Sequence, residues 1–309
     1  MVIAIVGPTA SGKTELALKL AREQNGEIIS VDSRQVYRHL HIGTAKPEGV
    51  WVAGLYLVAG IPYHLVDIWE PDQIFTAADF VQLASEKIAE ITRRGKTPIL
   101  AGGTGLYFKA LFEGLAPLPP RDETLRQKLH ALAEEKGRPF LHRQLAHVDP
   151  AAAAKIPINN IARVTRALEV YELTGKPISE WHKEHQNNQR IASFKQLERS
   201  NVEEISSCLK DVTYRGIWSE KAELHARIAG RCAAMLKDGM IEETEQLLKK
   251  GYARDCPALS GLGYPRVLDH LDGRLTREAL LMFLIQDTRQ YAKRQLTWFR
   301  HQMGVTWKK

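Results

Sequence analysis

The segment GPTASGKT near the start of the chain has the residue types and the spacing of a phosphate-binding loop. It matches the pattern G-x-x-x-x-G-K-[ST] and stands between a short apolar run and a helix-like stretch. The glycines let backbone N–H groups approach a polyphosphate, Lys13 supplies positive charge, and the Thr14 hydroxyl can ligate Mg²⁺. The expected phosphate site consists of Gly7, Pro8, Thr9, Ala10, Ser11, Gly12, Lys13 and Thr14. The pattern leaves open whether the chain is a kinase or an ATPase, or uses the same loop in another reaction.

A second candidate for chemistry is Asp32, which ends the apolar run EIISVD. A carboxylate at the C-terminal end of a parallel strand lies at the crevice where α/β sheets bind ligands. In a kinase this carboxylate could hold Mg²⁺ or the acceptor, whereas in another transferase it could be a general base. The alternative is a structural Asp that caps a helix or closes a turn.

The segment AGGTGLYFKAL follows a third apolar run and carries a turn rich in glycine. Gly102, Gly103 and Gly105 permit a tight turn and the close approach of another backbone, and Thr104 offers a hydroxyl at the carboxyl edge of the sheet. Glycines in such a turn are as often structural as functional. Thr104 is therefore a candidate that needs support from elsewhere in the chain.

The elements that must position these residues follow a repeating strand and helix pattern in the first 115 residues. Short apolar runs without strict alternation suit parallel strands that are buried on both faces, and they are VIAIVG, EIISVD, YHLVDI and TPILAGG. Helix-like stretches lie between them, at residues 14–23 and in a longer segment with Thr76 as its cap and Gly95 as its stop. The pattern predicts an α/β fold with a P-loop NTPase-like parallel sheet flanked by helices.

After LAPLPPRDE the pattern changes, and residues 124–186 read as helices only. Residues 187–211 are polar and aperiodic, TYRGIWS reads as one more strand, and further helices follow, including a long one over residues 277–301. We therefore expect a P-loop α/β core over residues 1–120 and an all-helical insertion over residues 121–190. Residues 191–309 are expected to return to the core and to form a helical C-terminal segment.

Composition indicates the class of protein and of partner. The chain of 309 residues has 43 Lys and Arg against 36 Asp and Glu, a net charge of +7, which favours an anionic partner. Residues 289–309 hold six basic and no acidic residues, which suits either a phosphate-facing surface or a solvated helix face. Three cysteines without a C-x-x-C pair suit a reduced, cytoplasmic chain. No signal peptide or membrane span is expected, because WVAGLYLVAG falls far short of the ~20 residues that a span needs.

Eight segments resemble, in order and spacing, the bacterial tRNA dimethylallyltransferases, also called isopentenyl-tRNA transferases. The segments are GPTASGKT, DSRQVYRHLHIGTAKP, IPYHLVDI, FTAADF, GGTGLYFKAL, RALEVYELTGKPIS, LSGLGY and RQYAKRQLTWFR, and the resemblance extends over nearly the whole chain. The resemblance implies a P-loop used without ATP hydrolysis. It implies transfer from dimethylallyl diphosphate to the exocyclic amine of the adenosine immediately 3′ of the anticodon in tRNA, with release of diphosphate. It also implies Mg²⁺ as cofactor and the tRNA anticodon stem-loop as partner. We further expect no membrane partner and a monomer.

The same resemblance assigns roles to individual residues. Asp32 resembles the general base, Thr104 the residue that lines the channel between diphosphate and adenine, and Lys13 a residue that stabilises the leaving diphosphate. Positions that resemble tRNA contacts, besides Asp32 and Thr104 themselves, are Ser33, Arg34, Gln35, Arg126, Arg163, Arg166, Lys293, Arg294 and Arg300. For the basic residues a solvated face is the alternative.

Two positions depart from the family pattern. Lys221 stands where many members have an arginine near the diphosphate, and a lysine keeps the charge but loses the bidentate fork. The segment SGLGYP resembles one of the family's tRNA-binding stretches, but its Pro265 stands where a basic residue is common, which weakens that tRNA contact.

Three other functions are compatible with a phosphate-binding loop. A nucleoside or small-molecule kinase would leave DSRQVY and GGTGLYFKAL unexplained. A prenyltransferase acting on free adenine nucleotides would not need the insertion or KRQLTWFR. A P-loop RNA-binding protein would bind anticodon arms without turnover.

Overall fold

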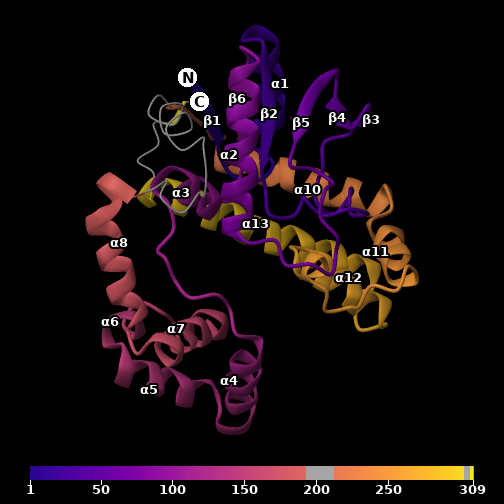
Figure 1. The fold of residues 1–309 in the computed structure, drawn as a ribbon. Helices are drawn as coiled ribbons and strands as arrows, with labels where there is room; N and C mark the ends of the chain where they lie inside the picture. Colours follow the sequence, from indigo (N-terminus) through magenta and orange to yellow (C-terminus); the bar gives the residue numbers. More distant parts are fainter. Residues whose placement is uncertain (193–211, 303–306, 309) are drawn as a thin grey trace. The chain divides into compact units, whose positions relative to one another are not determined.

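The computed structural model describes residues 1–192, 212–302 and 307–308, and its first unit is organised around one eight-stranded sheet (Figure 1). In spatial order the strands are β3 (Val50–Val52), β4 (Leu55–Val58), β5 (Ile61–His64), β2 (Gly26–Val31), β6 (Thr97–Gly102), β1 (Val2–Val6), β7 (Val212–Ile217) and β8 (Trp307–Lys308). In this order, neighbouring strands from β5 to β8 pair parallel, whereas β3 with β4 and β4 with β5 pair antiparallel. The predicted α/β fold with a mostly parallel sheet is confirmed.

The central strands are buried on both faces, as their continuous apolar sequences predict. Every residue of β1 is buried, and alternate residues belong to different apolar clusters: Val2 and Val6 face one side, Ile3 and Ile5 the other. Helix α1 (Lys13–Glu23) covers the second side. The first side is covered by α2 (Ala77–Arg93), α3 (Gly105–Glu113) and α13 (Arg277–Gln302), which contribute Phe80, Phe108 and Phe299.

Helix α2 begins where its sequence predicts. The Thr76 side chain accepts a hydrogen bond from the Asp79 N–H, and the Asp79 carboxylate accepts one from the Thr76 N–H in return. This capping box satisfies two N–H groups that have no partner inside the helix. The helix ends at Arg93, and Gly95 follows with a φ of 70° that glycine adopts without strain.

Two parts of the first unit differ from the expected elements. The run YHLVDI is a strand only as far as His64, because Leu65 and Asp67 have φ values of 59° and 58° that break the extended backbone. The segment WVAGLYLVAG forms the β3–β4 hairpin, which was not expected as strand. Among the residues that the structure describes, no helix is both long and apolar enough to cross a bilayer.

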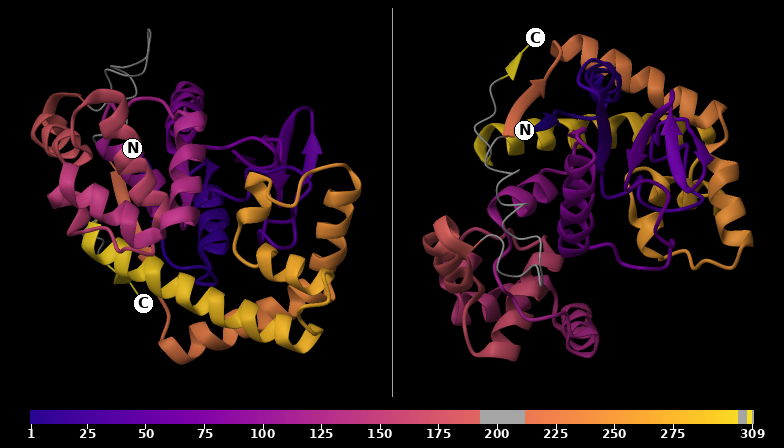
Figure 2. Two further views of the ribbon diagram at one scale, coloured as in Figure 1. Left: turned by 90° about the horizontal axis from the view of Figure 1, so that it is seen from below. Right: turned by 45° about the horizontal axis from the view of Figure 1, so that its top comes forward.

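The second half of this unit is helical. Its elements are α10 (Lys221–Lys237), α11 (Met240–Lys249), the short 3₁₀ helix η1 (Pro257–Ser260), α12 (Tyr264–Leu271) and α13. Figure 2 shows α10 and the long α13 packed against each other. These helices supply side chains to the site that the strand ends create.

The second unit, Glu113–Lys195, has its own apolar core. Leu141, Leu145, Val164 and Val170 are fully buried in it. Its helices are α4 (Glu123–Lys136), α5 (Arg138–Val148), α6 (Pro150–Ala153), α7 (Ile161–Thr174) and α8 (Ile178–Ala192). Helix α8 includes residues 187–192, so the irregular connection predicted for residues 187–211 is wrong for these six positions, and the rest of that range lies outside the described residues.

Candidate active site

The phosphate-binding loop connects β1 to α1 and forms one wall of a cavity of about 270 Å³. Gly12 precedes α1 with a φ of 90°, a left-handed conformation that glycine adopts most easily. The turn directs the N-terminus of α1 towards the cavity, where its free N–H groups favour an anion. The cavity is also lined by residues outside the loop, among them Asp32, Gln35, Tyr63, Arg231 and Gln295.

Lys13 lies in the wall of this cavity and its ammonium donates a hydrogen bond of 2.5 Å to the Pro8 carbonyl. Desolvation of the ammonium, reinforced by the charge of Arg231 and opposed by Asp32, lowers the pKa of Lys13 to about 7. A phosphate in the cavity would offset this desolvation, since a nearby negative charge favours the charged form of lysine. The site is therefore electrostatically suited to an anion.

Asp32 directly follows β2, and its surroundings support both interpretations that the sequence left open. Its Oδ1 atom accepts hydrogen bonds from the N–H groups of Arg34 at 2.8 Å and Gln35 at 3.3 Å, so the residue does close a turn. Oδ2 receives no hydrogen bond from the residues that the structure describes. Asp32 also lines the cavity. One carboxylate oxygen therefore fixes the turn, and the other is free to act on a ligand.

Thr104 lies beside this turn. Its N–H donates to the Val31 carbonyl and its hydroxyl oxygen accepts from the Ser33 N–H, at 3.2 Å in each case. The hydroxyl therefore holds the end of β2, next to Asp32. Thr104 is not among the residues lining the cavities described here, and its role in the reaction channel stays a prediction.

Gln295 of α13 is a site residue that the sequence did not reveal. Its Oε1 accepts from the Thr9 N–H at 2.8 Å, and its Nε2 donates to the Gly103 carbonyl at 2.9 Å. A Cβ on Gly103 would lie 2.2 Å from Gln295 Nε2, and a Cβ on Gly105 would lie 2.2 Å from the Trp298 ring. The glycines of GGTG therefore make room for α13, and Gln295 ties that helix to the phosphate-binding loop.

Arg231 of α10 was also missed. Its guanidinium is half-buried and donates to the Thr9 hydroxyl at 3.2 Å, and desolvation lowers its pKa. Lys221, which the family resemblance places near the diphosphate, begins the same helix, is exposed, and is not among the residues lining this cavity. The second cation of the cavity is thus Arg231.

A second cavity of about 360 Å³ adjoins the first, and Asp32, Thr44 and Arg231 line both. One side of the second cavity is apolar, formed by Met235, Met240, Leu262 and Leu284 among others. A phosphate site and a partly apolar site therefore meet at Asp32.

The two residues after Ser33 contribute to the walls of these cavities. The Arg34 guanidinium donates to the Pro257 carbonyl at 2.7 Å and to the Ser260 hydroxyl at 3.2 Å. The Gln35 amide accepts from the Ser30 hydroxyl at 2.9 Å and donates to the Ala45 carbonyl at 3.1 Å. Contact of Ser33, Arg34 and Gln35 with tRNA stays a prediction.

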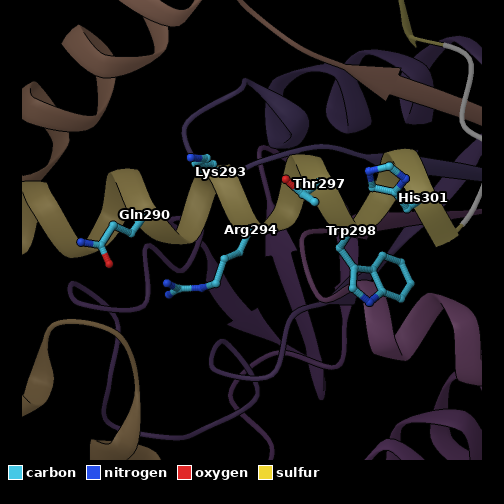
Figure 3. A pocket seen from close by; sticks show the side chains of 6 residues that line it. All are labelled: Gln290, Lys293, Arg294, Thr297, Trp298 and His301. Atoms are coloured by element: carbon cyan, nitrogen blue, oxygen red, sulfur yellow. The ribbon is translucent and has the colours of Figure 1, made fainter. Parts of the chain in front are cut away.

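The C-terminal helix α13 presents a basic face. Figure 3 shows side chains at successive turns of α13 around a hollow of about 610 Å³, namely Gln290, Lys293, Arg294, Thr297, Trp298 and His301. Lys293, Arg294 and Arg300 are exposed, whereas Phe299 is fully buried. The predicted division of this helix into a basic outer face and an apolar inner face is confirmed.

The three arginines predicted in the helical unit differ in their surroundings. Arg163 is exposed on α7, but Arg166 donates to the Glu169 carboxylate and to the Pro119 carbonyl, both at 2.7 Å. Arg126 lies 3.7 Å from the same carboxylate, and the Glu169 side chain is fully buried. A solvated basic face is therefore the wrong description for Arg126 and Arg166.

Among the described parts of the chain, no cluster of three or more His, Cys, Asp or Glu side chains could hold a metal. The Thr14 hydroxyl and the carboxylates of Glu15 and Asp32 lie in the first cavity and are oxygen ligands of the kind that Mg²⁺ binds. Because Mg²⁺ is usually bound by one or two protein groups together with substrate phosphates, this set fits Mg²⁺.

Comparison with known proteins finds similarity to one family over nearly the whole chain. A family model described as IPP transferase matches residues 35–302. The tRNA dimethylallyltransferase of Geobacter sulfurreducens is 45% identical, with 99% of this chain and 90% of the relative covered. That of Elusimicrobium minutum is 44% identical over 97% of this chain and 91% of the relative.

Two solved structures are similar. The full-length tRNA isopentenylpyrophosphate transferase from Bacillus halodurans has a TM-score of 0.65 at 40% identity, covering 99% of this chain and 89% of the other. A eukaryotic dimethylallyltransferase acting on tRNA has a TM-score of 0.70 at 29% identity, covering 96% and 69%. The chain belongs to the IPP transferase family.

Proposed function

We propose that this protein transfers a dimethylallyl group from dimethylallyl diphosphate to the exocyclic amine of the adenosine immediately 3′ of the anticodon in tRNA. The observation that carries the proposal is the place of Asp32, on the wall shared by a cationic phosphate cavity and a partly apolar cavity. The activities named for the relatives at 44% and 45% identity support it.

The phosphate cavity serves the leaving group. As the bond between the allylic carbon and the diphosphate oxygen breaks, negative charge builds on the diphosphate. Lys13, Arg231 and the N–H groups at the start of α1 face that charge and stabilise it more strongly in the transition state than before it. Mg²⁺, when bound, supplies further charge neutralisation, and Thr14 would hold it.

Asp32 serves the acceptor. An adenine amine is a weak nucleophile, so it must be oriented and must lose a proton as its nitrogen bonds to the allylic carbon. Oδ2 of Asp32 accepts that proton, while the electron pair of the broken C–O bond leaves with diphosphate. Thr104 holds the adjacent turn through the Ser33 N–H and is proposed to border the path between donor and acceptor.

The tRNA contacts complete the proposal. A base stacked in the anticodon loop cannot reach Asp32, so the nucleotide must be extruded into the site. Lys293, Arg294 and Arg300 are exposed and suited to phosphates of the tRNA backbone, as is Arg163 in the helical unit. In this scheme residues 1–120 hold the donor, 121–190 bind the anticodon stem-loop, and 191–309 return to the core with further tRNA-binding helices.

We also propose a monomer acting in the cytoplasm.

Arg163 and Arg166 should respond differently to replacement by alanine. Arg163→Ala should reduce the salt dependence of tRNA binding by about one unit of slope without changing stability, because an exposed phosphate contact is lost. Arg166→Ala should lower the free energy of unfolding by ~3 kcal/mol, because Glu169 stays buried without its closest cation. Salt-titrated tRNA binding and urea unfolding measure the two effects. Arg163→Lys is the control that keeps the charge. An unchanged slope in Arg163→Ala would indicate that Arg163 lies on a solvated face and does not contact tRNA.

The proposed reaction is tested by following diphosphate release from the purified protein. Release should require Mg²⁺, unmodified tRNA and dimethylallyl diphosphate together, and ATP should not replace the allylic donor. Replacing tRNA by AMP tests the prenylation of free nucleotides. Loss of phosphate from ATP without any change in tRNA would indicate a kinase or an ATPase, and tRNA binding without release would indicate an RNA-binding protein.

A further inference from the structure

Glu243 of α11 is a buried carboxylate that lines neither cavity and has no role in the reaction described above. Its side chain accepts hydrogen bonds from three successive backbone N–H groups. Oε2 accepts from His41 and, at 2.7 Å, from Ile42, and Oε1 accepts from Gly43 at 3.1 Å. Successive N–H groups that converge in this way form an anion-binding nest, and here the anion belongs to the protein itself.

The loop that Glu243 holds leads directly into the site. Thr44 and Ala45 follow Gly43 and, like Asp32, line both the phosphate cavity and the adjoining cavity. The Ala45 carbonyl accepts from Gln35, so this short wall is also tied to the turn after β2.

The far end of the loop is fixed by an ion pair. The Lys46 ammonium lies 2.7 Å from the Asp67 carboxylate, and its side chain is fully buried. Since both ends of the wall are held by charged groups, the wall has little freedom to move.

Tyr264 joins this arrangement from α12. Its hydroxyl donates to Glu243 Oε1 at 2.9 Å, and only 1% of its surface is exposed. A Cβ on Gly43 would lie 2.5 Å from that hydroxyl oxygen, so only a glycine allows the approach. The tyrosine of LSGLGY, a segment that the family resemblance assigned to tRNA binding, therefore contacts the loop rather than solvent.

We infer that Glu243 is a positioning residue that sets the Thr44–Ala45 wall against Asp32 and so controls the chemical step rather than substrate affinity. The inference rests on the proposed function for its kinetic readout. Hydrogen bonds to a carboxylate are stronger than those between neutral groups. The Glu243 carboxylate accepts four, from three N–H groups and the Tyr264 hydroxyl, and so orders the loop in the free protein. Removing one acceptor oxygen leaves buried N–H groups unsatisfied, so the loop must shift.

The test replaces Glu243 by Gln, which keeps the shape but turns one acceptor oxygen into an NH₂ group. Single-turnover transfer should slow by roughly 10- to 100-fold, as expected for a small displacement of a site wall. The Kd values for tRNA and for dimethylallyl diphosphate should stay close to those of the unchanged protein. Hydrogen exchange at the amides of residues 41–43 should become faster. Glu242→Gln is the matched control, because Glu242 is the exposed neighbour on the same helix and should change neither readout.

Tyr264→Phe gives a second, milder variant if Glu243→Gln does not fold, and it should slow transfer in the same direction. A normal transfer rate together with faster amide exchange would overturn the inference. Weaker binding of both tRNA and dimethylallyl diphosphate, by a factor as large as the loss in transfer rate, would also overturn it. If the unchanged protein shows no transfer at all, the proposed function fails. The exchange at residues 41–43 then still reports whether Glu243 orders the loop.

Discussion

Asp32→Asn is expected to lower turnover by roughly 10²-fold or more while tRNA and the allylic diphosphate still bind. The amide oxygen of Asn can accept the hydrogen bonds that Asp32 Oδ1 receives from Arg34 and Gln35, so the turn after β2 is preserved. What the variant loses is the group that takes the proton from the adenine amine. Single-turnover transfer rates, compared with Kd values measured separately, distinguish the two properties.

Asp32→Ala is the companion variant, since it removes both the base and the turn. It should lose turnover at least as strongly, and it should lose stability where Asp32→Asn does not. Near-normal turnover in Asp32→Asn would restrict Asp32 to the structural role.

Lys13→Met is expected to lower turnover by about 10²- to 10³-fold, because it removes a positive charge that stabilises the leaving diphosphate.

Lys13 should also make the proton uptake that accompanies diphosphate binding depend on pH. Because its pKa is lowered to about 7, the free Lys13 is mostly uncharged at about pH 8, and a bound diphosphate restores the charge. Binding at about pH 8 should therefore take up about one proton, and the uptake should vanish below about pH 6, where Lys13 is already charged.

Calorimetry in buffers of different ionisation enthalpy measures this uptake. Lys13→Met is the control for the unsubstituted protein. Methionine cannot take up a proton, whereas any change in the ligand's own protonation should be the same in both proteins. Equal uptake in both proteins would assign the proton to the ligand and contradict the description of Lys13.

The parts of the fold that the sequence predicts are those encoded by neighbours along the chain. The apolar runs of β1, β2 and β6, the capping box at Thr76 and the phosphate-binding loop each depend on residues within about one turn or strand of one another. The β3–β4 hairpin carried such a signal and was still missed. Val52 pairs with Leu55 across Ala53 and Gly54, both with positive φ, and a two-residue turn that ends in glycine is a hairpin signal. The pairing of Arg166 with Glu169 was likewise visible as a spacing of three on a helix.

The parts that could not be predicted depend on residues far apart in the chain. Gln295 contacts Thr9 across 286 positions, Arg231 contacts Thr9 across 222, and Glu243 contacts His41 across 202. Nothing in the periodicity of α10, α11 or α13 distinguishes these polar residues from solvated ones. Only the folded arrangement, which brings α10 and α13 to the phosphate-binding loop and α11 to residues 41–43, shows these contacts.

Attachment of a five-carbon group to one adenosine of tRNA can be measured directly. The purified protein is incubated with Mg²⁺, unmodified tRNA and dimethylallyl diphosphate, the tRNA is digested with nuclease, and the anticodon-loop fragment is examined by mass spectrometry. We expect the added mass of one dimethylallyl group on the adenosine immediately 3′ of the anticodon, present with the allylic donor and absent when ATP alone is supplied. An unmodified fragment, together with loss of phosphate from ATP, would contradict the proposed transfer and make the phosphate-binding loop a nucleotide site.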